Sequence, residues 1–281
     1  MPHVRLDPVK LTGVSTPNRP FRQNEDWLGS RAEMVVLLDG CGVPDSVSGE
    51  LETGCSHGLP WFLKSLGTAL LRNGEDTRAS LSDVLATSIS QTCAAHQTRC
   101  DLTHPLTPAS TVVMLRGDAS TVDYLVLSDS TLLVDDGGDE PMVISDDRVR
   151  SLALPGFGDL RPDSRQYREV ASARLHERAR MRNHPEGYPV ASTDPQAAYQ
   201  AVTGQIRRDR VRRALLASDG ATRLVDMFDQ LTWTQLLDLA FTAGPEGVID
   251  RTREVEDADT ACLAWPRGRA YDDATVALCR W

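Results

Sequence analysis

Residues 34–42 read MVVLLDGCG, an apolar run that ends on Asp39 and Gly40. A run of Val and Leu predicts a strand that is buried on both faces. A carboxylate at the end of such a strand loses its water at a high cost unless something binds it. Asp39 and Gly40 therefore form either an ordinary Asp-Gly turn or the start of a ligand site at the edge of the core.

The composition is that of an acidic globular protein. The chain has 281 residues, of which 41% are hydrophobic and 25% charged, and its formal net charge is −10. A nucleic-acid-binding protein would show a basic surface, so no nucleic-acid partner is expected. The six cysteines contain no CxxC pair and are expected to be reduced thiols. We find neither a signal-peptide h-region nor a membrane-spanning stretch, and we expect a cytoplasmic monomer without a membrane partner.

Helices are predicted in pairs and strands in runs. Helical periodicity extends over residues 57–71 and 79–99 and over most of 232–260, with a short helix near 195–202 and an Arg-rich, solvated helix within 155–187. Strands are predicted for VRLDPVKLTGV, MVVLLDG, STVVMLRG, TVDYLVLSDS, TLLVDD, MVISDD, GYPVAS, RRALLASDG and DDATVALCRW. This pattern predicts an α+β fold with largely antiparallel sheets.

Other acidic residues stand at similar strand ends. Asp219 follows the strand of ALLASDG and precedes a glycine, Asp272 and Asp273 precede the last strand, and Asn24-Glu25-Asp26 follows the first. Magnesium and manganese prefer such all-oxygen ligands. A carboxylate shared by two ions would hold them about 3.5–4 Å apart, a spacing that activates a bridging water for attack on phosphorus.

The ordered set NED, VLLDGCG, SDS, ASDG and DDAT resembles the metal-dependent protein phosphatase 2C family. That family carries R-x-x-x-E-D, D-G-x-G, G-D-S, S-D-G and D-N-x-T elements in the same order. The resemblance extends from about residue 12 to residue 281. It implies a four-layer sandwich in which two antiparallel β-sheets are flanked by helix pairs, within one domain of residues 1–281. Residues 155–190 would be a flap or insert.

The resemblance also implies two Mn²⁺ or Mg²⁺ ions in a cleft at one end of the sandwich. Asp39 would bridge both ions, and Gly40 would donate its backbone carbonyl. Asp219 and Asp272 would be the other ligands of one ion. A hydroxide held between the ions would hydrolyse a phosphomonoester without a phosphoenzyme.

The remaining predicted site residues follow from the same motifs. Glu25 and Asp26 would bind the second ion or position water, and Asp129 of SDS would belong to a third, weaker metal site. The family arginine that binds phosphate corresponds to Phe21 here, so Arg22 is the better candidate and Arg19 lies farther away.

Three further positions depart from the family motifs. Cys41 stands where many members have a histidine that donates a proton, which leaves that role to water or to His57. Asp273 replaces an asparagine and could exchange roles with Asp272. Thr131 replaces an arginine.

The expected activity is that of a protein serine/threonine phosphatase with a phosphoprotein substrate. Two alternatives stay open: a phosphatase-like module that binds metal and regulates partners without turnover, and a phosphatase of a small-molecule phosphoester. A zinc site on Cys41, Cys55 and His57 is not expected, because structural zinc sites usually present a second closely spaced pair of ligands.

Overall fold

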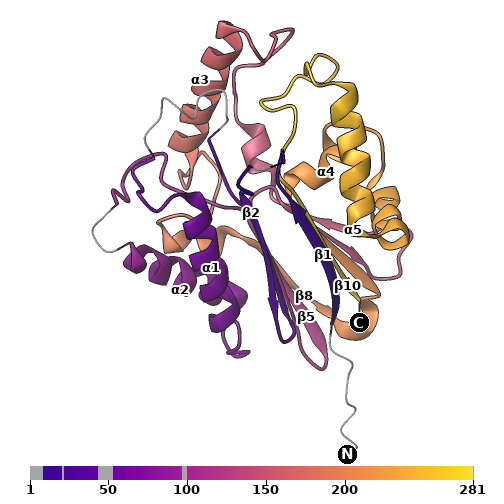
Figure 1. The fold of residues 1–281 in the computed structure, drawn as a ribbon. Helices are drawn as coiled ribbons and strands as arrows, with labels where there is room; N and C mark the ends of the chain where they lie inside the picture. Colours follow the sequence, from indigo (N-terminus) through magenta and orange to yellow (C-terminus); the bar gives the residue numbers. More distant parts are fainter. Residues whose placement is uncertain (1–8, 21, 44–52, 97–99, 281) are drawn as a thin grey trace, which may run out of the picture.

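The computed structural model describes residues 9–20, 22–43, 53–96 and 100–280. Two five-stranded antiparallel sheets form its centre (Figure 1). One sheet has the order β1 (Lys10–Thr16), β10 (Ala274–Arg280), β9 (Arg213–Ala217), β6 (Thr131–Asp135) and β7 (Met142–Ile144). The other has the order β2 (Asp26–Arg31), β3 (Met34–Asp39), β4 (Val112–Gly117), β5 (Thr121–Leu127) and β8 (Val202–Arg207).

Helices cover the outer face of each sheet. The helices α1 (Leu59–Asn73) and α2 (Leu81–Ala95) pack on the β2–β8 sheet, and α4 (Asp219–Asp226) and α5 (Trp233–Ala258) pack on the β1–β7 sheet (Figure 1). The predicted four-layer sandwich of the α+β class is therefore confirmed.

The strand β3 shows why the sequence folds into these layers. Its alternate residues Val35 and Leu37 enter the core between the two sheets, and Met34, Val36 and Leu38 enter the core under α1 and α2. Because side chains alternate across a strand, an unbroken apolar run lets β3 fill both interfaces. The aspartate that follows is thereby fixed at the edge of the sandwich.

Capping residues define several helix ends. The hydroxyl of Ser80 accepts the N–H of Asp83 at the start of α2, and Thr232 and Gln235 form a capping box at the start of α5. The two helices predicted within 232–260 are joined in α5, which is interrupted at Gly244 (φ 84°) before Pro245. The Arg-rich helix is α3 (Arg165–Met181).

Some predicted elements were wrong. GYPVAS forms no strand and makes only isolated bridges, because Pro189 has no N–H to donate to a ladder. The strands β2 and β8 and the helix α4 were missed. β8 is an edge strand with mostly exposed side chains, so its sequence lacks the apolar alternation of a buried strand. Residues 4–8 of the first predicted strand lie outside the described residues.

None of the helices in the described ranges has the length and apolar character needed to cross a bilayer. All six cysteines are free thiols, as the sequence predicts.

Candidate active site

The acidic residues at the strand ends come together at one edge of the sandwich. Asp39 ends β3, and Asp26 stands opposite it in the β2–β3 ladder. Asp219 begins α4 directly after β9, and its N–H donates to Oδ2 of Asp39 at 3.3 Å. Because Asp39 belongs to one sheet and Asp219 follows the other, this hydrogen bond joins the two halves of the sandwich.

Asp39, Asp129, Asp219 and Asp272 line one cleft, of about 460 Å³, together with Gly40. We call it the carboxylate cleft. Glu25 and Arg22 line a neighbouring cavity of about 560 Å³, and the two spaces share Cys41, Gly42 and Arg269 among their walls. The structure therefore brings Asp39, Asp129, Asp219, Asp272 and Gly40 together in one cleft but places the predicted ligand Glu25 and the predicted phosphate-binding residue Arg22 in the adjoining cavity.

Gly40 lies where no side chain fits. A Cβ at this position would stand 2.5 Å from the backbone oxygen of Glu25 and 2.8 Å from Leu59. The N–H of Gly40 donates to that same Glu25 oxygen at 2.8 Å, and its carbonyl accepts the N–H of Gly42 at 2.8 Å. The carbonyl retains a second lone pair for another partner. The Asp-Gly turn thus fixes the direction of the Asp39 carboxylate.

Asp26 is buried behind the cleft rather than on its wall. Its Oδ2 accepts hydrogen bonds from the hydroxyls of Ser218 (2.9 Å) and Thr275 (2.7 Å). Its Oδ1 has no partner among the described residues. Burial, reinforced by the charge of Asp273 and opposed by the two hydroxyls, raises the pKa of Asp26 to about 8.

The carboxylates of the cleft repel one another. Burial and the charge of Asp219 hold the pKa of Asp39 well above its usual range. Burial and the charges of Asp272 and Asp129 raise the pKa of Asp219 to about 7. Burial also raises the pKa of Asp129, against the opposing charges of nearby arginines. Such a group of buried carboxylates is stabilised by a bound cation.

Comparisons with known proteins bear on the fold. No protein-family model matches the sequence, and no curated protein matches it significantly. Solved structures do match. The Mycobacterium tuberculosis serine/threonine phosphatase PstP/Ppp is 15% identical, with 97% of this chain and 98% of that chain covered and a TM-score of 0.54. The chain has the fold of bacterial serine/threonine phosphatases.

Two further structures support the same assignment of the fold. PppA, a regulatory component of T6SS in Pseudomonas aeruginosa, is 16% identical, with 97% of each chain covered and a TM-score of 0.55. A PstP catalytic domain in complex with two manganese ions is also 16% identical, with 97% and 98% covered and a TM-score of 0.55.

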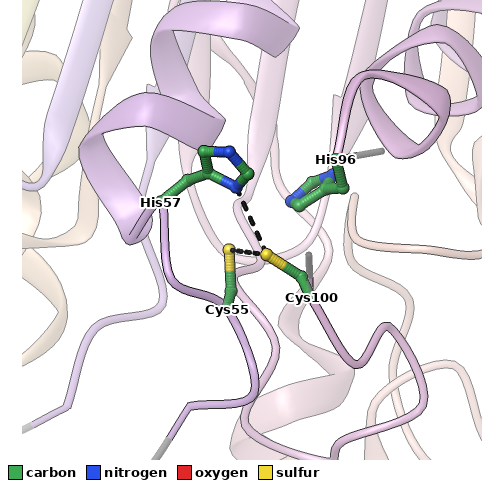
Figure 2. A group of neighbouring side chains, drawn as sticks. All are labelled: Cys55, His57, His96 and Cys100. Atoms are coloured by element: carbon green, nitrogen blue, oxygen red, sulfur yellow. Dashed lines mark hydrogen bonds between the residues drawn. The ribbon is translucent and has the colours of Figure 1, made fainter. Parts of the chain in front are cut away.

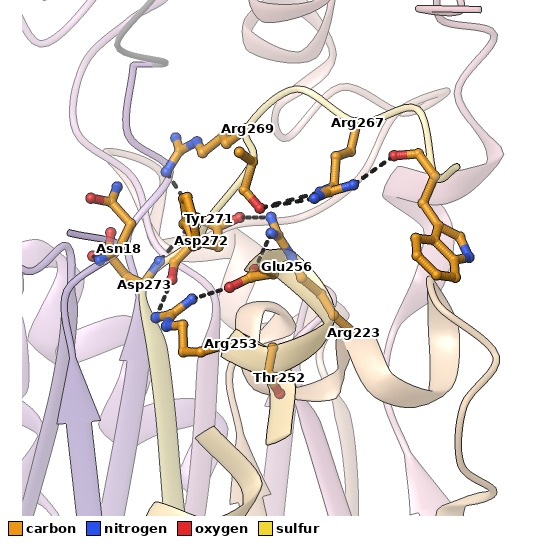
Figure 3. A network of polar contacts seen from close by, with 12 residues as sticks. Asn18, Arg223, Thr252, Arg253, Glu256, Arg267, Arg269, Tyr271, Asp272 and Asp273 are labelled. Atoms are coloured by element: carbon orange, nitrogen blue, oxygen red, sulfur yellow. Dashed lines mark hydrogen bonds and ion pairs between the residues drawn. The ribbon is translucent and has the colours of Figure 1, made fainter. Parts of the chain in front are cut away.

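Asp272 differs from the other carboxylates because arginines hold both of its oxygens. Nη2 of Arg223 lies 2.5 Å from Oδ2, and Nη1 of Arg269 lies 2.9 Å from Oδ1 (Figure 3). Burial alone would raise the pKa of Asp272, but the two guanidinium groups outweigh it and lower the pKa. Arg269 also lies 3.7 Å from Glu25. Sequence analysis missed both arginines.

A row of arginines on α3 and at its C-terminal end faces the carboxylates. Arg174, Arg178 and Arg182 all line the carboxylate cleft. Arg182 donates to the backbone oxygens of Thr107 (3.1 Å) and Cys41 (3.3 Å). Arg178 is exposed and has no hydrogen bond or ion pair with another described residue. Arg174 and Arg178 lie four residues apart on one face of α3, a spacing that the sequence shows, and Arg182 follows the helix with extended backbone angles.

The positions that depart from the phosphatase motifs have distinct surroundings. Asp273 is buried, and its Oδ1 accepts the N–H of Asn18 at 2.8 Å, so that Asp272 and not Asp273 lines the cleft. Thr131 is the first residue of β6 and is buried in the sheet. His57 lies outside both cavities, against Trp61. Phe21 lies outside the described residues.

Proposed function

We propose that the protein is a metal-dependent phosphomonoester hydrolase that removes phosphate from phosphoserine or phosphothreonine in proteins. One observation carries the proposal. In a fold shared with serine/threonine phosphatases, carboxylates from two sheets face a row of arginines across one cleft. Carboxylates suit divalent cations, and guanidinium groups suit phosphoryl oxygens.

The donor set of the cleft fits Mn²⁺ or Mg²⁺. The raised pKa values of Asp39 and Asp219 reflect burial and mutual repulsion of the carboxylates, and Oδ1 of Asp26 is buried without a hydrogen-bond partner among the residues that the structure describes. Asp39, the Gly40 carbonyl, Asp219 and Asp272 would hold one ion. Asp39 would also bind the second ion, together with Glu25 and Asp26. Asp129 would belong to a third, weaker site. When bound, the ions would neutralise phosphoryl charge and activate the attacking water.

The side chains of this protein bind and orient the phosphoryl group. Arg178 makes no hydrogen bond or ion pair with another described residue that phosphate would have to displace, and it extends from α3 over the cleft. Arg182 is committed to two backbone carbonyls and positions the wall. Arg22 lines the adjoining cavity and would contact a group beyond the phosphate. This division gives phosphate binding mainly to Arg178.

The leaving serine or threonine needs a proton. Among the described residues that line the two cavities there is no histidine. Cys41 lines both, and burial raises the pKa of its thiol, so it stays protonated and is a weak acid. Water in the cleft therefore supplies the proton.

The substrate is proposed to approach past residues 155–190, which include α3 and part of the cleft wall. The protein would act as a cytoplasmic monomer on phosphoproteins, without nucleic-acid or membrane partners. The net charge of −10 argues against a nucleic-acid partner.

Hydrolysis of p-nitrophenyl phosphate by the purified chain tests the proposal. We expect turnover with added Mn²⁺ and none after chelation. Absence of turnover at every metal concentration would contradict it and favour a non-catalytic module. Comparison of phosphoserine and phosphothreonine peptides with small phosphoesters tests the substrate class, because a protein phosphatase should have the higher kcat/KM on peptides.

A further inference from the structure

Four side chains of the kinds that bind metal meet where α1 begins and α2 ends, and none of them lines the carboxylate cleft. Cys55 and His57 precede α1, whereas His96 caps the end of α2 and Cys100 follows it. One ligand atom from each residue lies within 4.8 Å of the corresponding atoms of the other three (Figure 2). The sequence-based expectation that no second closely spaced pair accompanies Cys55 and His57 is wrong, because His96 and Cys100 form that pair. Cys41 is not part of the group.

His96 directs a buried ring nitrogen without a hydrogen-bond partner among the described residues into this group. Its side chain is 2% exposed, and its Nδ1 lies 2.9 Å from the backbone carbonyl of Thr92. Since a carbonyl only accepts, Nδ1 holds the proton and Nε2 is left as an acceptor. Nε2 is buried and has no hydrogen-bond partner among the described residues. A carbonyl that fixes the tautomer of a histidine in this way is characteristic of a metal ligand.

The two sulfur atoms and the second histidine point at one another. The Sγ atoms of Cys55 and Cys100 are 3.4 Å apart, and Nδ1 of His57 lies 3.2 Å from Sγ of Cys100 (Figure 2). The two cysteines and the two histidines thus each place one ligand atom at a common point.

We propose that Cys55, His57, His96 and Cys100 bind a structural zinc ion. Zn–S bonds of about 2.3 Å and Zn–N bonds of about 2.0–2.1 Å give a tetrahedron with edges of about 3.3–3.8 Å. The S–S separation of 3.4 Å and the N–S separation of 3.2 Å are each about 0.4 Å shorter than the corresponding tetrahedral edges, and all four ligand atoms lie within 4.8 Å of one another, so small side-chain movements would open the group around an ion. Two thiolates and two imidazoles form a ligand set that binds zinc in preference to magnesium or manganese.

The proposed site is structural because four protein ligands leave no open position for a substrate. It joins the start of α1 to the chain after α2. The N-cap of α1 is Gly58, which has no side chain to accept a hydrogen bond from the first backbone N–H groups of the helix. A metal ion bound by Cys55 and His57 would hold the start of the helix in place instead. The next residue, Leu59, packs against Gly40 beside the carboxylate cleft. Zinc would thereby fix α1 against the turn that directs Asp39.

A disulfide between Cys55 and Cys100 is the competing interpretation. Its bond length would be about 2.0 Å. The 3.4 Å separation of the sulfurs is that of two thiols, and a disulfide would leave Nε2 of His96 without a partner. Zinc accounts for the thiols and the imidazole together.

The test is the zinc content of the full-length chain, expressed with zinc in the medium and measured by atomic spectroscopy after gel filtration. We expect about one zinc per chain, and near-complete loss in Cys100→Ser and His96→Gln. Cys93→Ser and His176→Gln are the matched controls, because they change the same residue types outside the group. Both should retain zinc, as should Asp39→Asn, which alters only the carboxylate cleft.

A second measurement does not depend on whether the variants fold. Wild-type protein loaded with Co²⁺ should show the thiolate-to-cobalt charge-transfer absorption of a tetrahedral sulfur-containing site. Zinc lost in Asp39→Asn but kept in Cys100→Ser would place the ion in the cleft and overturn the proposal. Wild-type protein without zinc and without the cobalt absorption would also overturn it, as would two missing thiols on titration of the unreduced chain.

Discussion

Nη1 of Arg269 lies 2.9 Å from Oδ1 of Asp272, one of the carboxylates that we propose as metal ligands. A guanidinium and a divalent cation compete for the same carboxylate oxygen. Asp272 is therefore neutralised by arginines, whereas Asp39 and Asp219 form no ion pair with another described residue and have raised pKa values. A metal ion that binds Asp272 must therefore displace Arg269 or share the carboxylate with it.

Removal of Arg269 should strengthen metal binding. Arg269→Gln frees Oδ1 of Asp272 and removes a positive charge 3.7 Å from Glu25. Partly exposed ion pairs contribute about 0.2–1 kcal/mol, so we expect the Kd for Mn²⁺ to fall up to about fivefold in calorimetric titration. Arg251→Gln, which removes an exposed ion pair with Glu254 on α5, should leave the Kd unchanged. Weaker binding in Arg269→Gln would show that Arg269 supports the metal site.

Asp39→Asn and Asp219→Asn should each abolish turnover of p-nitrophenyl phosphate. Both side chains line the cleft, and the amide supplies one acceptor oxygen without the negative charge. We expect kcat/KM to fall by at least about a hundredfold, with an unchanged circular dichroism spectrum. Asp273→Asn is the matched control because Asp273 faces Asn18 rather than the cleft, and it restores the residue of the motif. Near-normal activity in Asp39→Asn would contradict the site.

Without metal, the protein should lose stability as pH rises from about 5 to 8. The pKa of Asp219 rises from 3.8 in the unfolded chain to about 7 in the folded one, and that of Asp26 to about 8. The folded state therefore keeps protons that the unfolded state has released, so the free energy of unfolding falls with pH across this window. Thermal unfolding in the presence of a chelator at pH 5.5, 7 and 8 measures this pH dependence of stability. Asp219→Asn should flatten the profile, and Mn²⁺ should stabilise wild type more at pH 8 than at pH 5.5.

Local sequence was sufficient to predict the layers of this fold. The apolar run of β3 and the strand-end aspartates predicted both the buried sheet and the edge at which the carboxylates meet. The strand β8 could not be recognised in the same way, because an edge strand buries too little to impose an apolar pattern.

The charged partners of the cleft depend on contacts that the sequence does not display. Arg223 reaches Asp272 across 49 residues of chain and Glu256 across 33. Such pairings follow from how α4, α5 and the chain before β10 pack, and no local spacing encodes them. Arg174, Arg178 and Arg182 are different, since their four-residue spacing was visible. What was missing was the knowledge that this face of α3 lies over the cleft.

Arg178→Gln should impair substrate binding without affecting metal binding. The exposed guanidinium lines the cleft and is free to contact phosphate, but it is not an oxygen ligand. We expect KM for p-nitrophenyl phosphate to rise roughly tenfold, since a hydrogen bond to a charged group contributes about 1.5–3 kcal/mol, with the Kd for Mn²⁺ unchanged. Arg168→Gln is the control, because Arg168 is exposed on α3 outside the cleft lining. Equal kinetics in the two variants would remove Arg178 from phosphate binding.

Glu256 should be essential for stability, because it supports the arginine that holds Asp272. Its carboxylate is fully buried and accepts from Arg223 at 2.6 Å and from Arg253 at 2.5 Å (Figure 3). Glu256→Ala leaves the buried Arg223 with Asp272 as its one ion-pair partner among the described residues, so we expect the free energy of unfolding to fall by about 3–5 kcal/mol. Glu254→Ala, two residues away on the exposed face of α5, should cost less than about 1 kcal/mol. Urea unfolding of the two variants compares them directly, and similar midpoints would show that the buried network adds nothing to an exposed ion pair.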